Sequence, residues 1–191
     1  MGDEDDKLRA DAQANRDRIL DVAREAFKAD PRASLNSIAK GAGIGPGTLY
    51  RHFPSREALL AGVYKKEIDA LVSLVPTMLA DRPPLDALRH WAERFIGFGE
   101  LKHGVFDTLG GGLTAQDKQA AYKPLAGAVR QLLMACVEAG TIKPEVEPDD
   151  ILTLLGLLLR IPASPAGKAQ SKRIIDLIFQ GIMINNGPID C

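Results

Sequence analysis

Residue types that commonly mark a catalytic or metal-binding centre are scarce in this 191-residue chain. The two cysteines, Cys136 and Cys191, lie too far apart in sequence to form a CxxC motif or a zinc-binding pattern, and this usage suits a reducing cytoplasm. His90 and His103 lack the spacing of metal ligands. No nucleophile lies beside a base in a recognisable setting. We therefore expect that the chain is not an enzyme and binds no metal and no cofactor.

Long apolar runs are also missing. A membrane-spanning helix needs about 18 to 20 consecutive apolar residues, and the most apolar stretch, residues 151–161, is far shorter. The first six residues include four acidic ones with no apolar segment behind them, which does not fit a secretory signal peptide. We expect a cytoplasmic protein without a membrane partner.

The net charge of the whole chain is only −1, but the charge is unevenly distributed. Residues 7–66 carry twelve Lys or Arg and six Asp or Glu, a net charge of +6. Residues 67–191 carry twelve and fifteen, a net charge of −3. A basic segment joined to a mildly acidic one suggests that the basic segment alone binds a polyanion.

Apolar residues recur at helical spacing almost throughout the chain, and no alternating β pattern of convincing length is present. We expect an all-α fold of about nine helices. The clearest helical segments are residues 13–29, 35–42, 46–53, 56–76, 85–98, 125–137, 151–161 and 168–183. The expected organisation is an acidic disordered N-terminus (1–12), a three-helix domain (13–60), a larger helical domain (61–184) and a C-terminal tail (185–191).

The segment GAGIGPGTLYRHF (41–53) places four glycines and a proline within seven positions. Glycine-rich loops often bind phosphate, but the nucleotide-binding patterns do not fit. A GxGxxG motif starting at Gly41 would need glycine where Pro46 lies, and one starting at Gly43 would need it where Thr48 lies. The Gly-Lys-Ser/Thr ending of a P-loop is absent, and both folds need a preceding β-strand. We therefore exclude a nucleotide-binding loop.

The same segment fits a helix, a tight turn and a second helix. Gly43 supplies the backbone freedom that a sharp turn needs, and Pro46 suits the first turn of the following helix. With Leu49 and Phe53 facing inward, steps of about 100° per residue place five residues on or beside the outer face. These are Gly47, Thr48, Arg51, Tyr50 and His52. A second helix with such a face lies in the major groove in helix-turn-helix proteins, and a helical hairpin that binds no DNA is the alternative.

Residues 15–64 resemble the DNA-binding domain of the TetR family of transcriptional regulators. The resemblance rests on Arg18-Ile19-Leu20, Ala23 and Ala26-Phe27, and on the segment SLNSIAKGAGIGPGTLYRHFPSREALL (34–60). The rest of the chain is similar to the family's ligand-binding and dimerising domain in length and helix count. Within it, EAGTIKPEVEPDDILTLLGLLLR (138–160) resembles the SbtR-like subgroup.

The resemblance implies a three-helix DNA-binding domain with a helix-turn-helix, followed by a helical ligand-binding and dimerisation domain. It implies a homodimeric repressor that leaves a palindromic operator in double-stranded DNA when a small apolar or amphipathic effector binds. The alternative is a helical adaptor or ligand-binding protein that does not bind DNA. Salt separates the two, because DNA binding through several Lys and Arg weakens steeply as salt rises.

Matching positions assign DNA contacts to three groups of residues. These are Ser34, Asn36 and Ser37 at the start of the second helix, Gly45, Pro46, Gly47, Thr48 and Arg51 in the major groove, and Tyr50, His52 and Arg56 on phosphates. Tyr50 also fits as a brace between helices. The third helix starts with Gly45-Pro46-Gly47, where the family often has a polar residue that reads a base. Backbone contacts and DNA shape are therefore expected to carry more of the specificity.

Aromatic residues make up only 5% of the chain, and several of them are concentrated in one span of the larger domain. They suit either an ordinary core or an apolar ligand pocket between helices. The residues that would line such a pocket are Trp91, Phe95, Phe98, Phe106, Leu133 and Met134.

The last two expected helices are apolar on almost every side. Such a helix must be covered on every side, which favours a homodimer built on a four-helix bundle across a two-fold axis. The interface residues would be Leu154, Leu155, Leu158, Ile175, Ile178, Phe179 and Ile182. A buried central hairpin in a monomer is the alternative.

Overall fold

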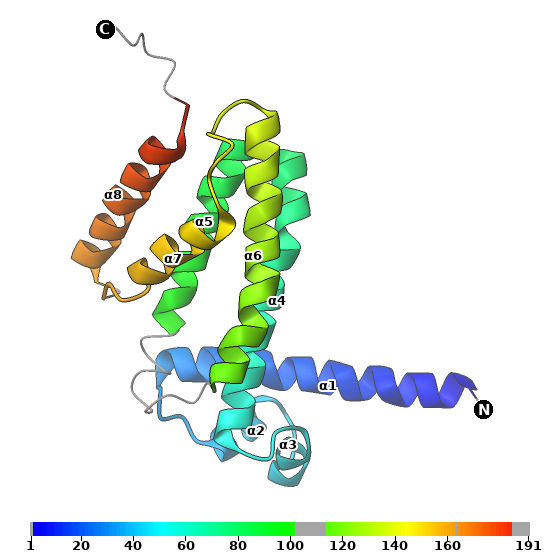
Figure 1. Ribbon diagram of the computed structural model, residues 1–191. Helices are drawn as coiled ribbons and strands as arrows, with labels where there is room; N and C mark the ends of the chain where they lie inside the picture. Colours follow the sequence, from blue (N-terminus) through cyan, green and yellow to red (C-terminus); the bar gives the residue numbers. More distant parts are fainter. Residues whose placement is uncertain (1, 102–113, 163, 185–191) are drawn as a thin grey trace, which may run out of the picture. The chain divides into compact units, whose positions relative to one another are not determined.

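The computed structural model describes residues 2–101, 114–162 and 164–184. Within these residues the chain forms eight α-helices, and its extended backbone pairs in an isolated antiparallel bridge between Ile142 and Met183 (Figure 1). The helices are α1 (Gly2–Ala29), α2 (Leu35–Gly41), α3 (Pro46–His52), α4 (Arg56–Asp81), α5 (Pro84–Leu101), α6 (Ala115–Glu138), α7 (Pro148–Leu158) and α8 (Pro165–Ile182). The all-α prediction is confirmed, with eight helices in the described residues where about nine were expected for the chain.

The chain divides into two compact units. The first contains Met1–Glu67 and Gly104–Lys118, and the second contains Ile68–His103 and Gln119–Cys191. The division after Glu67 falls within α4, a few residues beyond the domain boundary expected after residue 60. Helix α4 therefore contributes residues to both units.

The core of the first unit is formed by one apolar stripe on each of its helices. Its buried members are Ile19, Leu20, Ala23 and Phe27 from α1, Ile38 and Ala39 from α2, Leu49 from α3, Phe53 after it, and Leu59, Leu60 and Val63 from α4. The stripes follow the three- and four-residue spacing of an amphipathic helix. Fully burying one large apolar side chain contributes about 1.5–3 kcal/mol, so this cluster accounts for the association of short helices that would not be stable alone.

Two glycines allow the helices of this unit to approach closely. A Cβ atom on Gly62 of α4 would lie 2.8 Å from Cε1 of Phe53 and 2.9 Å from Cδ2 of Leu20. A Cβ atom on Gly41 of α2 would lie 2.9 Å from Cγ1 of Val22. Because real Cβ atoms do not approach other atoms so closely, the positions of α2 and α4 against α1 depend on the missing side chains.

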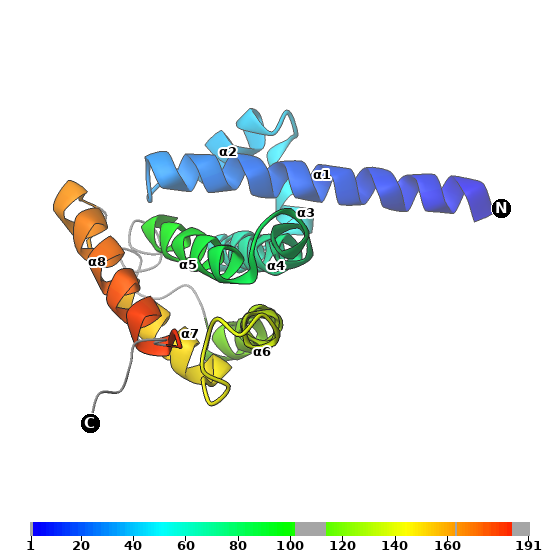
Figure 2. The same cartoon turned by 90° about the horizontal axis from the view of Figure 1, so that it is seen from above.

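The start of α1 corrects one prediction. Residues 2–12, which were expected to be disordered, form the first turns of α1, and the N-terminal half of this helix extends beyond α2 and α3 in Figure 1 and Figure 2. Acidic residues favour the first turn of a helix because of the helix dipole, and the sequence has four of them at positions 3–6. The Ala, Lys, Arg, Gln and Leu residues that follow also favour a helix.

The second unit is organised around Trp91 of α5, which is completely buried. Its indole N–H donates a hydrogen bond of 2.9 Å to the backbone carbonyl of Leu71 in α4. Its ring stacks on Phe95, with the ring centroids 5.6 Å apart and the planes inclined by 17°. The hydrogen bond satisfies the one polar atom of the buried ring and fixes α5 in one orientation on α4.

Helices α7 and α8 pack on each other and on α5. Leu88 of α5, Leu155 of α7 and Phe179 of α8 are buried where the three helices meet. Arg89 of α5 forms an ion pair with Asp176 of α8, and its guanidinium carbon lies 4.4 Å from the centroid of the Phe179 ring. One face of α8 is thereby attached to α5, and the opposite face remains at the surface.

Helix α6 begins ten residues earlier than the predicted start at Leu125. The N–H and hydroxyl groups of Thr114 donate hydrogen bonds of 2.8 and 2.7 Å to Oδ2 of Asp117, and the Asp117 N–H donates to Oγ1 of Thr114 at 3.1 Å. This reciprocal pattern is a capping box, and it starts the helix ahead of its apolar stripe. The hydrogen bonds from Thr114 also hold the pKa of Asp117 below its ordinary value.

The close approach at Gly62 predicts a loss of stability when that glycine is replaced. In Gly62→Ala the added methyl meets the buried Phe53 ring, and overpacking of this kind typically costs about 1–3 kcal/mol. Gly127→Ala on α6 is the matched control, because a Cβ atom there meets nothing within 4 Å and alanine favours a helix by up to about 1 kcal/mol. Chemical denaturation should show opposite signs for the two variants, and equal stability would contradict the packing described here.

Candidate nucleic-acid interface

The turn between α2 and α3 is built around Gly43. This residue has φ +68°, a left-handed conformation that glycine adopts without strain. The N–H of Ile44 donates to the carbonyl of Ala39 at 3.0 Å, and the N–H of Gly43 donates to the carbonyl of Lys40 at 3.1 Å. These bonds end α2 and turn the chain sharply, so that Gly45 becomes the residue that precedes α3.

The start of α2 is held by two serines that cap it. Oγ of Ser34 accepts a hydrogen bond of 3.0 Å from the N–H of Ser37, and the Ser37 hydroxyl donates to the Ser34 carbonyl at 2.7 Å. Serine is among the residues preferred at this position because it satisfies a free N–H group of the first turn. Ser34, Asn36 and Ser37 are all exposed, so the structure brings these three predicted DNA contacts to one end of α2.

Helix α3 has one buried and one exposed side. Leu49 is completely buried and Phe53, directly after the helix, is almost so. The exposed predicted contacts are Gly45, Pro46, Gly47, Tyr50 and Arg51, and the half-buried ones are Thr48 and His52. Arg51 lies along its own helix, with Nε donating to the Gly47 carbonyl at 3.3 Å. The structure therefore gathers the predicted α3 residues on or beside one outer face.

Gly45 and Gly47 are not required by the packing of the protein. A Cβ atom at either position would meet nothing within 4 Å, and neither has a positive φ. This distinguishes them from Gly43, which forms the turn, and from Gly41 and Gly62, which allow close packing. Because Gly45 and Gly47 carry no side chains, another molecule can approach the backbone at the start of α3 closely.

The side chain of Arg56 makes contacts within the protein that the sequence analysis did not predict. Its Nη1 donates a hydrogen bond of 2.6 Å to the carbonyl of Ala33, and its Nη2 donates to the carbonyl of Pro31. The guanidinium carbon lies 4.8 Å from the centroid of the Phe27 ring. The predicted phosphate ligand thus turns toward the loop between α1 and α2.

Sequence reasoning did not identify the residues that connect α1 to α4. Nζ of Lys66 lies 2.7 Å from Oδ1 of Asp21, and Nε of Arg24 lies 2.6 Å from Oε1 of Glu67. Both pairs are partly exposed and contribute little stability individually. They join residues more than 40 positions apart, and no local pattern in the sequence predicts such a pairing.

The predicted pocket residues separate into different environments. Trp91, Phe95 and Leu133 are buried in the second unit, whereas Met134 is 55% exposed. The side chains of Phe98 and Phe106 lie outside the described residues. Met134 lies on the exposed side of α6, so it could line an enclosed pocket only if another segment covered it.

The predicted interface residues are likewise divided. Four of them, Leu155, Leu158, Ile175 and Phe179, are buried within the chain. Ile178 and Ile182 are half-buried, and Leu154 is 41% exposed. Two leucines that were not assigned to the interface are more exposed, Leu157 at 54% and Leu177 at 65%. The apolar run of each helix is therefore shared between an inner face and an outer one.

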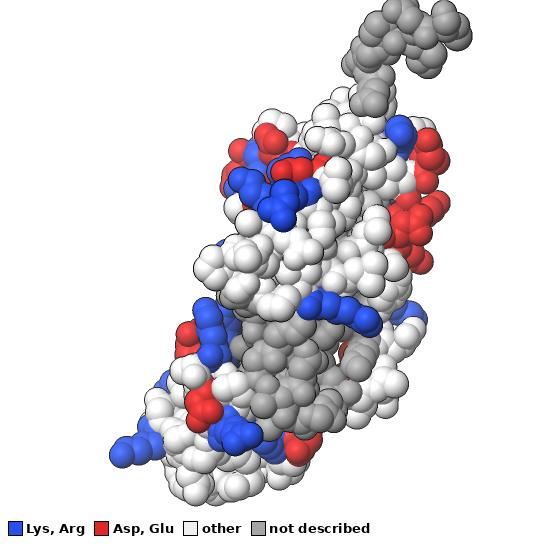
Figure 3. Space-filling view, turned by 90° about the vertical axis from the view of Figure 1, so that its left-hand side faces the viewer, with Lys and Arg blue, Asp and Glu red and all other residues white. Residues whose placement is uncertain are grey.

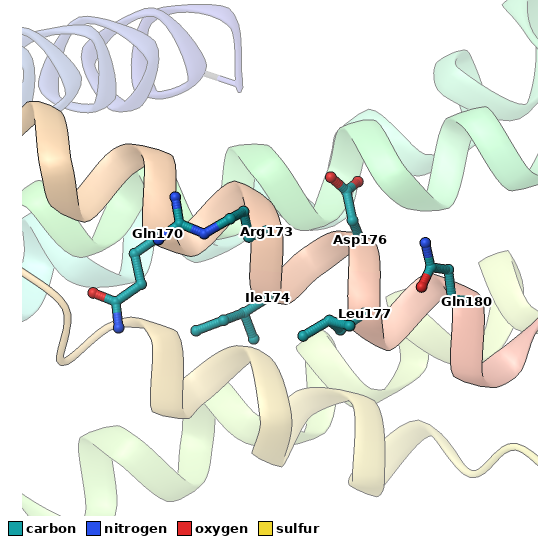
Figure 4. Close-up of a pocket in the computed structure, with 6 residues that line it drawn as sticks. All are labelled: Gln170, Arg173, Ile174, Asp176, Leu177 and Gln180. Carbon is teal, nitrogen blue, oxygen red and sulfur yellow. The ribbon is translucent and has the colours of Figure 1, made fainter.

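A groove runs along α8. It is lined by Gln170, Arg173, Ile174, Asp176, Leu177 and Gln180. Figure 4 shows Ile174 and Leu177 on the side of α8 that is nearer α7, whereas Asp176 points to the other side. Among the described residues, no group of three or more His, Cys, Asp or Glu side chains could hold a metal ion.

Helix α3 follows a tight glycine turn, packs on the core through one face and exposes the opposite face. This arrangement is typical of a helix-turn-helix DNA-binding protein. Residues 19–63 match the family described as bacterial regulatory proteins, tetR family. Residues 83–184 match the transcriptional regulator SbtR-like C-terminal domain. The chain belongs to the TetR family of transcriptional regulators, and the resemblance seen in the sequence is confirmed.

Solved structures of other family members agree with this assignment. The chain is 34% identical to the TetR transcriptional regulator SCO0520 from Streptomyces coelicolor, with a TM-score of 0.74 over 89% of this chain and 99% of that one. It is 30% identical to a TetR regulatory protein from Mycobacterium vanbaalenii, with a TM-score of 0.72 over 93% and 99%. Both similarities extend over the two units.

The chain matches curated relatives over about a third of their length. The HTH-type transcriptional regulator UidR of Escherichia coli is 45% identical over 60 residues, which are 30% of this chain and 31% of that protein. An HTH-type regulator of Staphylococcus aureus is 40% identical over 68 residues, 35% of this chain and 37% of that protein. The chain is therefore a DNA-binding transcription regulator and not an enzyme. None of its described helices combines the length and the apolar character needed to cross a membrane.

Proposed function

We propose that this chain is a homodimeric repressor that binds a palindromic operator with two copies of α3 and leaves it when a small molecule binds. The observation that carries the proposal is the two-sided character of α3. Leu49 fixes the rotation of the helix, and the opposite side offers Arg51 and Tyr50 as donors beside the open backbone at Gly47. In a two-fold dimer the two α3 helices would lie about 34–36 Å apart, which is one turn of DNA.

The proposed contacts on DNA come from two groups of residues. Ser34, Asn36 and Ser37 would bind the backbone from the start of α2, and Arg51 and Thr48 would face the major groove. Tyr50 is exposed, which supports its role as a phosphate donor over a brace between helices. Because Gly45 and Gly47 carry no side chain that could read a base, part of the specificity would come from the shape of the DNA.

The proposed dimer forms through the outer faces of α7 and α8. Leu154 and Leu157 on α7 and Leu177 on α8 leave large apolar side chains at the surface, and such patches mark interfaces. Figure 3 views the side on which α8 lies, and the middle of this face of the second unit is uncharged, with Lys, Arg, Asp and Glu at its edges. Two such faces would form a four-helix bundle. The buried Leu155 and Phe179 would support the interface from within each subunit.

The proposed effector is small and apolar or amphipathic, and it would bind in the second unit near Trp91 and Phe95. The hydrogen bond from Trp91 to the Leu71 carbonyl supports this proposal, because it connects the aromatic cluster directly to α4. A ligand that displaced Trp91 would act on the helix that also contributes to the DNA-binding unit. A coupling free energy of about 1–3 kcal/mol would be sufficient for release.

Replacing Arg51 tests the proposed role of α3. We expect Arg51→Ala to weaken operator binding by about 1–3 kcal/mol, since an exposed guanidinium on the outer face is lost while the core is untouched. Fluorescence anisotropy with the operator duplex measures the affinity, and gel filtration should show an unchanged dimer. Arg130→Ala on α6 is the matched control, because that exposed arginine belongs to the second unit. Unchanged affinity in Arg51→Ala would refute the role of α3.

Replacing Gly47 should change stability and DNA binding in opposite directions. The methyl group of Gly47→Ala meets nothing in the protein, and alanine stabilises a helix by up to about 1 kcal/mol relative to glycine. The same methyl would separate α3 from the DNA backbone and weaken operator binding. Thermal unfolding and anisotropy measure the two effects, and Gly127→Ala should stabilise the protein without changing the affinity. A Gly47→Ala variant that binds the operator as tightly as the wild type would show that close approach is not needed.

Replacing Leu157 tests the dimer. We expect Leu157→Glu to give a folded monomer in sedimentation experiments, because the side chain is 54% exposed in one chain and a buried charge would be costly in the bundle. Operator binding should fall with the loss of the second α3. Met134→Glu is the matched control, since Met134 is 55% exposed but lies on α6. A dimer that persists in Leu157→Glu would place the interface elsewhere.

A further inference from the structure

Arg56, the first residue of α4, occupies an unusual position for a cation. The N-terminus of a helix carries a partial positive charge, so an arginine in its first turn is disfavoured unless it finds negative partners elsewhere. In this structure the partners are the backbone carbonyls of Pro31 and Ala33 in the loop between α1 and α2. The planar guanidinium suits such a fork, because it presents several N–H donors in a fixed geometry.

Within the described residues, the carbonyls of Pro31 and Ala33 take no part in the backbone hydrogen bonds of the loop. The loop bonds internally through the Ala33 N–H, which donates to the Asp30 carbonyl at 2.9 Å, and through the Arg32 N–H, which donates to Oδ1 of Asp30 at 2.8 Å. Among the described residues, no backbone N–H donates to the carbonyl of Pro31 or of Ala33. Arg56 supplies donors to both carbonyls through hydrogen bonds that are partly buried, and carbonyls shielded from water need such partners.

The rest of the guanidinium faces the protein as well. Its carbon lies 4.8 Å from the centroid of Phe27, a completely buried residue in the last turns of α1. Its Nε is buried and has no hydrogen-bond partner among the described residues. Arg56, Phe27, Pro31 and Ala33 together form what we call the Arg56 bracket, which ties α1, the loop and α4 at one point.

The bracket ends at the residue where α2 is capped. Ala33 is followed by Ser34, whose hydroxyl oxygen accepts from the Ser37 N–H and whose carbonyl accepts from the Ile38 N–H at 3.1 Å. The Ala33 carbonyl that Arg56 binds is therefore directly adjacent to the residue that caps α2. Helix α2 in turn packs on α3, which carries the proposed DNA-binding face.

We propose that Arg56 is a positioning residue that holds the start of α2 in place through the loop carbonyls of Pro31 and Ala33, and that it is not a phosphate ligand. The guanidinium nitrogens that would reach for DNA are already committed within the protein. This inference rests on the proposed function, since it concerns how α2 and α3 are presented to the operator.

Two substitutions of Arg56 separate its charge from its geometry. Arg56→Lys keeps the positive charge, but one ammonium group cannot reproduce the fork on two carbonyls, and Arg56→Gln loses both. The probe is a DNA duplex that the wild type selects from a random pool. We expect both variants to bind this operator duplex roughly tenfold more weakly than the wild type, at every salt concentration. A phosphate ligand would behave differently. Lysine would preserve the contact, and its loss in Arg56→Gln would reduce the slope of log affinity against log salt by about 0.9.

Amide exchange in the protein without DNA tests positioning independently. In Arg56→Lys we expect faster exchange at the N–H groups of Ser37 and Ile38, while the N–H of Val63 in α4 keeps its protection. Arg32→Gln is the matched control, because Arg32 lies in the same loop but its side chain is exposed, and exchange in it should match the wild type. Faster exchange at all three amides would indicate a general stabilising role and would overturn the proposal.

Operator binding and amide exchange together distinguish a failure of the Arg56 bracket from a failure of the proposed function. If the wild type binds the operator and Arg56→Lys binds it equally well, the bracket is wrong and the proposed function survives. If the wild type binds no duplex, the proposed function fails, and the exchange rates of Ser37 and Ile38 still decide whether the bracket positions α2. Should Arg56→Gln fail to fold by circular dichroism, the comparison of Arg56→Lys with the wild type decides the outcome alone.

Discussion

The burial of Leu49 and Phe53 is the interaction on which the DNA-binding unit depends. Helix α3 has only seven residues, and a helix of that length is not stable in water by itself. It persists because Leu49 and Phe53 pack against the apolar stripes of the neighbouring helices. The same contact fixes the rotation of α3, and the rotation decides that Gly47 and Arg51 face outward. Fold and function in this unit therefore follow from a single packing constraint.

The residues around α3 keep this small unit rigid. Gly43 turns the chain without strain, and Gly62 lets α4 approach Phe53 and Leu20. Ion pairs from Lys66 and Glu67 join α4 to α1 on one side, and Arg56 joins α4 to the loop before α2. Helix α4 also carries Leu71, the acceptor for Trp91 in the second unit, so residues of this one helix belong to the packing of each unit.

Local patterns predicted the helices and the outer face of α3 well, and they predicted contacts between distant residues poorly. Periodicity was sufficient for α2 and α3 because Leu35 and Ile38 lie about one turn apart, as do Leu49 and Phe53. It missed the first turns of α1 and α6, where acidic N-terminal charge and a capping box form a helix without an apolar stripe. The resemblance suggested a phosphate contact for Arg56. No local pattern could reveal the carbonyls that Arg56 binds, because they lie 23 and 25 residues earlier in the chain.

The sequence by itself determined the all-α class, the helix-turn-helix and the TetR-like character, because each depends on neighbouring residues or on a short motif. Only the tertiary structure decided which leucines of α7 and α8 remain outside. Both helices are apolar on nearly all sides, so spacing cannot distinguish Leu155, which packs on α5, from Leu157, which stays exposed. That distinction arises because burial depends on where the other helices lie, and the apolar character of a residue does not specify its partner.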